Sequence, residues 1–170
     1  MVGHMPSKKV KSGDELLRIS EEMRLAGRKL VFTNGCFDLL HVGHVRYLQQ
    51  ARKLGDALLV AINSDASVRA LKGESRPINS QEDRAEVLAA LDCVDYVTVF
   101  KGNTVIGLLR ETKPQIYAKG GDYTIDSLNQ EELVVVREIA AEVKILSLVP
   151  GKSTTAVFEK MEPGEYGEKE

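Results

Sequence analysis

Short continuous apolar runs alternate along the chain with stretches of helical spacing. The runs predict five buried strands, at 30–33, 57–62, 96–100, 115–118 and 143–148. Apolar residues three and four positions apart predict helices at 14–26, 42–54, from 63–65 onward, 80–91, 103–112, 130–141 and 153–161. Asp14 is expected to cap the first helix, and Ser80 and Ser153 to cap two later ones.

Buried strands that each lead into a helix indicate a parallel sheet with helices on both faces. The predicted fold class is therefore α/β, a Rossmann-like, doubly wound five-stranded parallel sheet. Such sheets bind ligands beyond the carboxyl ends of the strands, where the strand order reverses. The segments that follow strands are accordingly the ones searched for chemistry: 33–44, 63–76, 119–124 and 149–155.

The length of 170 residues suits one domain. The first five residues read like a cloning remnant, and we expect residues 1–11 to be a tag or a disordered N-terminus. Residues 12–162 are expected to form a single domain, and the Gly- and Glu-rich residues 163–170 a flexible tail.

The composition of the chain limits the kinds of partner that we expect it to bind. A net charge of −2 argues against a broad nucleic-acid surface. Neither a membrane span nor a secretory signal is expected, because no apolar run approaches the necessary length. The two cysteines fit a reduced cytoplasm better than a disulfide framework. We therefore expect a cytoplasmic protein that acts on small molecules.

The segment after the first strand carries the clearest candidate chemistry. Asn34-Gly35 is expected to be a turn, and a helix is expected to begin near His41, offering free N–H groups to a phosphate. His41 and His44 are spaced i, i+3, so both imidazoles can donate to one phosphoryl oxygen. Gly43 between them leaves room for a ligand to approach the backbone. This pattern suits phosphoryl chemistry, in which the protein positions reactants and stabilises charge.

Other enzyme classes fit less well. No G-x-G-x-x-G and no G-x-x-x-x-G-K-[ST] is present, which disfavours dinucleotide-dependent dehydrogenases and Walker-type kinases. The two histidines could instead be surface or capping residues. A zinc pair is a further alternative, disfavoured because zinc sites need at least a third ligand beside two histidines spaced i, i+3.

The run Gly35-x-Phe37-Asp38-x-x-His41-x-Gly43-His44 resembles the signature of the cytidylyltransferase-like nucleotidyltransferases. The resemblance extends from about residue 12 to 161 through Asn63-Ser64-Asp65, Lys72-Gly73 with Arg76-Pro77, Asp83-Arg84, Lys119-Gly120-Gly121-Asp122-Tyr123-Thr124 and Ser153-Thr154-Thr155. The set is most similar to the adenylyltransferase half of the ADP-heptose synthases, here in a stand-alone form.

The resemblance implies transfer of AMP from ATP to D-glycero-D-manno-heptose 1-phosphate, with Mg²⁺ on the triphosphate and release of pyrophosphate. Its implied catalytic residues are His41, His44, Lys72 and Arg84. The implied substrate-phosphate contacts are Lys72, Arg76 and Lys152. The implied nucleotide-binding residues are Thr33, Asn34, Gly35, Cys36, Phe37, Asp38, Gly43, Lys119, Gly120, Asp122, Ser153, Thr154 and Thr155. Asp122 is also the candidate metal ligand, and relatives suggest a homodimer.

Alternative readings stay open for several of these residues. Lys72 and Arg76 could belong to a charged surface loop, and Arg84 to an exposed ion pair with its acidic neighbours. A structural turn role for Asp38 is as plausible as one in setting the loop or a histidine tautomer, and Phe37 is expected to pack in the core.

The substrate is also open. Many cytidylyltransferases carry an arginine where this chain has 148–152, and Lys152 would supply only a point charge there. This departure weakens the alternative of a cytidylyltransferase for glycerol 3-phosphate or phosphoethanolamine. A non-catalytic nucleotide-binding module is the alternative from another class.

Overall fold

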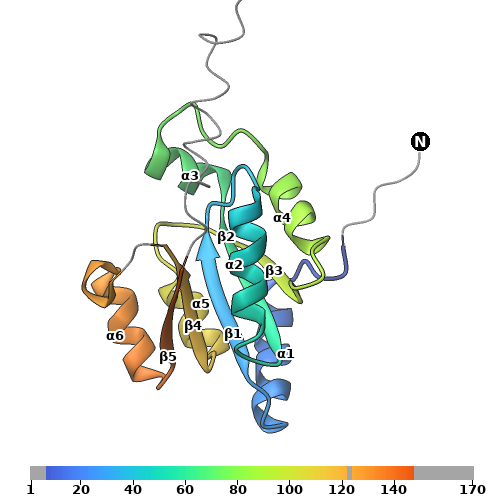
Figure 1. The fold of residues 1–170 in the computed structure, drawn as a ribbon, viewed down its shortest axis with the longest axis vertical. Coiled ribbons are helices and arrows are strands. Elements are labelled where there is room, and N and C mark those ends of the chain that lie inside the picture. The colour runs from blue at the N-terminus through green and yellow to red at the C-terminus, as the bar shows by residue number, and fades with distance from the viewer. Residues whose placement is uncertain (1–6, 122–123, 148–170) are drawn as a thin grey trace, which may run out of the picture.

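A five-stranded sheet forms the centre of the protein (Figure 1). The computed structural model describes residues 7–121 and 124–147. The strands are β1 (Leu30–Gly35), β2 (Ala57–Asn63), β3 (Tyr96–Phe100), β4 (Ile116–Gly120) and β5 (Glu142–Leu146). The helices are α1 (Gly13–Leu25), α2 (Val42–Arg52), α3 (Asp65–Lys72), α4 (Gln81–Ala89), α5 (Ile106–Thr112), the short 3₁₀ helix η1 (Ile125–Ser127) and α6 (Gln130–Glu138).

The strands lie in the order β3-β2-β1-β4-β5, and every neighbouring pair is parallel. The chain builds the sheet outward from β1 to β3, then returns to the other side of β1 to add β4 and β5. Strand order therefore reverses between β1 and β4, and the predicted doubly wound parallel sheet is confirmed. The carboxyl ends of β1 and β4 are where such a sheet binds its ligand.

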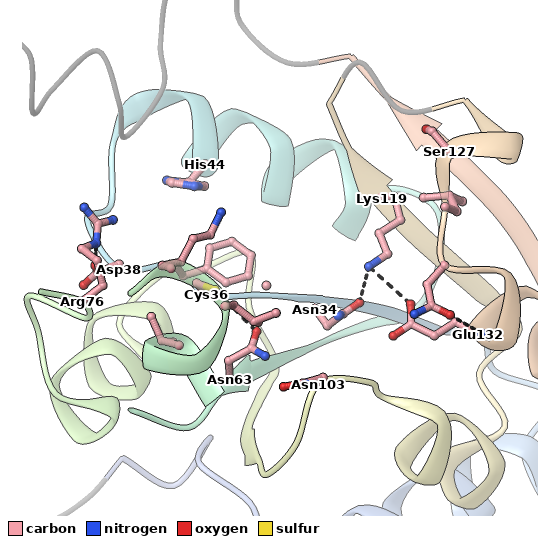
Figure 2. A pocket seen from close by; sticks show the side chains of 17 residues that line it. Asn34, Cys36, Asp38, His44, Asn63, Arg76, Asn103, Lys119, Ser127 and Glu132 are labelled. Carbon is pink, nitrogen blue, oxygen red and sulfur yellow. Dashed lines mark hydrogen bonds and ion pairs between the residues drawn. The ribbon is translucent and has the colours of Figure 1, made fainter. Parts of the chain in front are cut away.

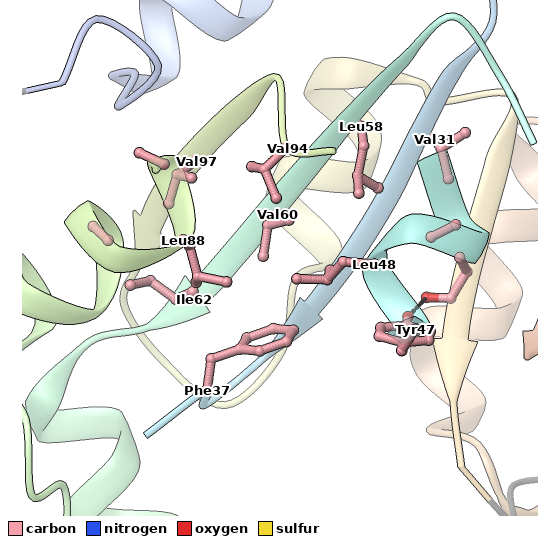
Figure 3. Packing of buried hydrophobic residues seen from close by; sticks show 14 of the residues in the cluster. Val31, Phe37, Tyr47, Leu48, Leu58, Val60, Ile62, Leu88, Val94 and Val97 are labelled. Atoms are coloured by element: carbon pink, nitrogen blue, oxygen red, sulfur yellow. Dashed lines mark hydrogen bonds between the residues drawn. The ribbon is translucent and has the colours of Figure 1, made fainter. Parts of the chain in front are cut away.

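Helices cover both faces of the sheet, and the strand side chains sort between them. In β2, Leu58, Val60 and Ile62 pack with α2 and α4 on one face (Figure 3). The alternate residues Leu59 and Ala61 pack with α1, α5 and α6 on the other face. All seven residues of β2 are buried, which explains why the strand reads as a continuous apolar run.

The first strand is longer than its sequence predicts. Asn34 and Gly35 were expected to form a turn, but they stay in β1 and pair with Ala61 and Ile62 of β2. The chain turns two residues later, at Phe37, whose φ of 47° is left-handed. The prediction was wrong because pairing with a long neighbouring strand outweighs the local turn preference of Asn-Gly.

Several element ends differ from the prediction by a few residues. Ser12, not Asp14, caps α1, and Glu15 completes a capping box with it. The last helix described ends at Glu138 because the chain turns at Ala140, where φ is 56°, and β5 starts two residues later. The predicted helix at 153–161 lies outside the described residues.

Residues directly before the predicted domain are ordered as well. Lys9 accepts a backbone hydrogen bond from Val97 and Lys11 donates one back to it, so this segment lies along the outer edge of β3. The folded region therefore begins before residue 12. Within 7–121 and 124–147, no helix is both long and apolar enough to span a bilayer.

Candidate active site

A cavity of about 740 Å³ opens at the carboxyl ends of β1, β2 and β4 (Figure 2). Its wall includes most of the described residues that the sequence predicts for the site: Asn34, Gly35, Cys36, Phe37, Asp38, His44, Lys72, Arg76 and Lys119. His44 and Arg76 lie at one end of the cavity, and Lys119 and Glu132 at the other. The cavity thus occupies the place where a doubly wound sheet binds its ligand.

The two histidines form a stacked pair at the start of α2. His41 is the N-cap of the helix, and its Nδ1 accepts a hydrogen bond of 3.1 Å from the Gly43 N–H. His44 Nδ1 accepts a longer one, 3.4 Å, from the His41 N–H. The ring centroids are 3.9 Å apart. Because its Nδ1 is used as an acceptor, the neutral His44 ring carries its proton on Nε2, where it can be donated to a ligand.

His44 is held in the neutral form. Burial, with a smaller contribution from the neighbouring His41, lowers its pKa to about 4. Its ring also packs against Phe37, with centroids 5.3 Å apart. Phe37 is buried in the core as expected, and it lines the cavity too.

Asp38 joins the histidine segment to the basic segment after α3. Its side chain is almost fully buried and accepts hydrogen bonds from the N–H groups of Ile78 and Asn79. Its other oxygen lies 2.6 Å from Arg76 Nε in an ion pair. Asp38 therefore fixes the loop that carries Arg76 against the cavity wall. This is a positioning role on the loop, one of the two roles that the sequence left open.

Arg84 lies beneath the cavity and is only 1% exposed. Its guanidinium donates to the backbone carbonyls of Cys36 (2.6 Å) and Asn63 (2.8 Å) and to the Asp65 carboxylate (2.7 Å). A fourth hydrogen bond reaches the Asn79 carbonyl. A side chain enclosed in this way offers no surface to a phosphate. The expected contact between Arg84 and a ligand therefore does not fit this arrangement, and neither does the alternative of an exposed ion pair.

A connected polar network lines the opposite end of the cavity. Lys119 Nζ donates a hydrogen bond of 2.7 Å to Asn34 Oδ1. The Tyr117 hydroxyl lies 3.0 Å from the same oxygen and donates to Glu132 Oε2 at 2.7 Å. Glu132 comes from α6, and its other oxygen accepts from the Val105 N–H. Burial lowers the pKa of Lys119, and the Glu132 carboxylate acts against that shift.

Some predicted residues lie off the main cavity, and His41, at the N-cap of α2, is one of them. The Thr33 side chain is buried and shares a 2.6 Å hydrogen bond with the Tyr47 hydroxyl, so it supports the core. Gly43 is buried in the first turn of α2. Gly120 lies against Tyr47 in a smaller adjoining hollow. The remaining predicted residues lie outside the described ones and stay predictions: Asp122, Lys152, Ser153, Thr154 and Thr155.

Sequence reasoning missed several polar residues of the cavity wall: Asn63, Asn103, Ser127, Asn129 and Glu132. Asn103 follows β3, the strand whose end was not searched, so extending the search to all five strands would have found it. Asn63 ends β2 and lies in the searched segment 63–76, but nothing in the sequence marked it as a binding residue. No local signal marks Glu132, because one acid among Gln130–Glu132 is indistinguishable from a solvated helix start.

Among residues 7–121 and 124–147, no group of three His, Cys, Asp or Glu side chains is arranged to hold a metal ion. Mg²⁺ commonly binds through substrate phosphates, water and one or two carboxylates, without a protein cage.

The chain is similar to known proteins over most of its length. Residues 32–162 match the family described as cytidylyltransferase-like. The chain is 51% identical over 160 residues to the bifunctional protein HldE of Geobacter sulfurreducens, covering 94% of this chain and 32% of that protein. It is also 51% identical over 152 residues to HldE of a Nitratiruptor species, with 89% and 32% covered. The chain thus spans about a third of the length of these relatives.

Two solved structures share the fold of this chain. The lipopolysaccharide core biosynthesis protein from Thermoplasma volcanium superposes with a TM-score of 0.60 at 30% identity, covering 72% of this chain and 98% of that one. A pantoate–β-alanine ligase from Francisella tularensis shares the fold, with a TM-score of 0.57 at 15% identity. The paired histidines at the head of α2, the cavity at the reversal of strand order and the match over residues 32–162 lead to one conclusion: the chain belongs to the cytidylyltransferase-like family and is a nucleotidyltransferase.

Proposed function

We propose that the enzyme transfers AMP from ATP to a sugar 1-phosphate, D-glycero-D-manno-heptose 1-phosphate, and releases pyrophosphate. The observation that carries the phosphoryl chemistry is the His41–His44 pair at the head of α2, in which the ring centroids are 3.9 Å apart and His44, with its Nδ1 accepting a hydrogen bond, faces the cavity. The nature of the acceptor rests on the similarity to HldE and to a lipopolysaccharide core biosynthesis protein.

The histidine end of the cavity suits a transferring phosphoryl group. Neutral imidazole donors stabilise charge that develops on its non-bridging oxygens, and a preorganised donor of this kind typically contributes about 10²–10³ in rate. Lys72, the last residue of α3, and Arg76, in the loop after it, line the same cavity and bring positive charge to it. They are the candidates to hold the phosphate of the acceptor in line with the α-phosphorus of ATP.

In this mechanism the acceptor phosphate attacks the α-phosphorus directly, and the bond to the β-phosphate oxygen breaks as pyrophosphate leaves. The protein forms no covalent bond: His41 and His44 donate hydrogen bonds, while Lys72 and Arg76 orient the attacking anion. Mg²⁺ bound to the triphosphate would neutralise charge on the leaving group. Asp122 is the proposed protein ligand for it, and Lys152 and the 153–155 segment are the proposed further phosphate contacts.

The test is pyrophosphate release with Mg²⁺, crossing ATP, CTP, GTP and UTP with heptose 1-phosphate, glycerol 3-phosphate and phosphoethanolamine. We expect release with ATP and the heptose phosphate. Release only with CTP and an alcohol phosphate would replace this proposal with a cytidylyltransferase. Nucleotide binding without release from any pair would favour a non-catalytic module.

Variants connect this activity to the site. His41→Ala and His44→Ala are each expected to lower turnover about 10²–10³-fold. Cys93→Ala, outside the cavity, is the control and should keep turnover per folded molecule. Equal losses in all three variants, with folding intact, would refute the roles of the histidines. The proposed homodimer and cytoplasmic location are separate predictions; light scattering of the purified protein tests the first.

A further inference from the structure

The end of the cavity opposite His44 differs from the histidine end in its charge. We call it the amide end and define it by Asn34, Asn103, Lys119 and Glu132, together with Asn129, whose side chain accepts a hydrogen bond from the Glu132 N–H. Its two charged groups, the Lys119 ammonium and the Glu132 carboxylate, lie 3.8 Å apart and cancel formally. Its other polar groups, the amides and the nearby Ser127 hydroxyl, are neutral. At the histidine end, two cations, Lys72 and Arg76, face one carboxylate, so phosphates are attracted there instead.

Glu132 is fixed in place at the amide end. Its side chain is 6% exposed and accepts hydrogen bonds from the Val105 N–H at 3.1 Å and the Tyr117 hydroxyl at 2.7 Å. A buried carboxylate is costly unless it is hydrogen-bonded and paired with an opposite charge. Both conditions are met here, so Glu132 presents a rigid negative charge beside Lys119.

Lys119 is likewise held but keeps donors for a ligand. Its side chain is 16% exposed, its Nζ donates to Asn34 Oδ1 at 2.7 Å, and it lies 5.0 Å from the centre of the Tyr117 ring. An ammonium group has three N–H donors, so it can bind a ligand atom without giving up the bond to Asn34.

We propose that the amide end is a hydroxyl-binding subsite, in which Lys119, oriented by Glu132 and Asn34, recognises the uncharged polyhydroxylated ring of a substrate. The inference rests on the proposed function, which supplies two such rings, the ribose of the nucleotide and the sugar of the acceptor. Hydroxyl groups both donate and accept, which matches an ammonium beside a carboxylate and amides. A phosphate fits poorly here, because the nearby Glu132 carboxylate repels it.

The test measures binding without turnover, on the full chain. ATP is compared with 2′-deoxy-ATP, 3′-deoxy-ATP and inorganic tripolyphosphate by titration calorimetry. Heptose 1-phosphate is compared with inorganic phosphate in the presence of a non-transferable ATP analogue. The variants are Lys119→Met and the double variant Lys119→Met/Glu132→Gln, which avoids leaving a buried carboxylate unpaired. Glu131→Gln, an exposed neighbour on α6, is the matched control.

In the wild type we expect loss of the recognised hydroxyl to weaken binding by about tenfold or more. The double variant should lose that preference while binding tripolyphosphate as before, and Glu131→Gln should keep it. A lost preference for ATP over a deoxy-ATP assigns the ribose. A lost preference for the heptose phosphate over inorganic phosphate assigns the acceptor.

Two results would overturn the subsite: unchanged preferences in the double variant, or an equal loss of ATP and tripolyphosphate binding. Because these ratios need no turnover, they stay meaningful if no acceptor reacts. Failure of the proposed function and failure of this inference are therefore distinguishable.

Discussion

Arg84 donates a hydrogen bond of 2.6 Å to the backbone carbonyl of Cys36, which lies 48 positions earlier in the chain, directly after β1. The same guanidinium holds the end of β2 through Asn63 and the start of α3 through Asp65. One buried side chain thus ties together the segments that form the histidine end of the cavity. We therefore expect Arg84 to act through the shape of the site and not through contact with a ligand.

Replacing Arg84 should therefore destabilise the whole fold. Arg84→Met leaves Asp65 and three carbonyl groups without their donor, and we expect a loss of about 3 kcal/mol or more in the free energy of unfolding. Urea denaturation measures it. Arg110→Met is the control, because Arg110 forms an exposed ion pair with Glu138, worth less than about 1 kcal/mol. Similar losses in both variants would contradict the role assigned to Arg84.

Asp38 should control the position of Arg76. Asp38→Asn keeps an oxygen for the Ile78 and Asn79 N–H groups but loses the charge that pairs with Arg76. We expect KM for the phosphorylated acceptor to rise about tenfold, with faster proteolysis between residues 73 and 80. Asp92→Asn, at an exposed position, should change neither. An unchanged KM in Asp38→Asn would show that the ion pair does not position Arg76 for the substrate.

The lowered pKa of His44 predicts how the free energy of unfolding depends on pH. Its folded pKa of about 4 lies below the ordinary value of 6.5, so between these values the unfolded chain binds more protons. The stability contributed by neutral His44 is complete above pH 6.5 and is lost as the pH falls towards 4. His44→Asn should therefore lose less stability than the wild type across this window, as measured by urea denaturation at each pH. Parallel curves would show that His44 titrates normally.

Gly120 is required by the ring of Tyr47. A Cβ at this position would lie 2.7 Å from two carbons of that ring, and Tyr47 is itself held by hydrogen bonds to Thr33 and the Ala118 carbonyl. Gly120→Ala should cost about 1–3 kcal/mol in unfolding free energy. Gly107→Ala, in α5 with no atom within 4 Å of the new Cβ, should instead stabilise by about 0.5–1 kcal/mol. A Gly120→Ala protein as stable as the wild type would mean that Tyr47 moves freely.

The features that sequence predicts best are local ones. Ser80 caps its helix as expected, and Ser64 caps α3 within the segment 63–65 where a helix was expected to start, because an N-cap bond joins residues three apart. His41 begins α2 for the same reason. The doubly wound sheet follows from apolar runs that alternate with helices, and it too is read from short segments.

The features that sequence misses depend on distant partners. Arg84 looks like a surface arginine next to Glu82 and Asp83, and only the folded chain brings it to the Cys36 carbonyl. Glu132 likewise becomes a cavity residue through Tyr117 and Val105, which are 15 and 27 positions away. The burial of a charged group is decided by long-range contacts, and no spacing pattern records them.

The most direct test of the central claim follows the α-phosphorus of ATP. ATP labelled at that atom is incubated with heptose 1-phosphate, Mg²⁺ and the protein, and the products are separated. The account predicts that the label moves into a nucleotide sugar in equal amount to the pyrophosphate released, and that His44→Ala slows both by about 10²–10³. Label found only in ATP or in free AMP, with no nucleotide sugar formed, would contradict it.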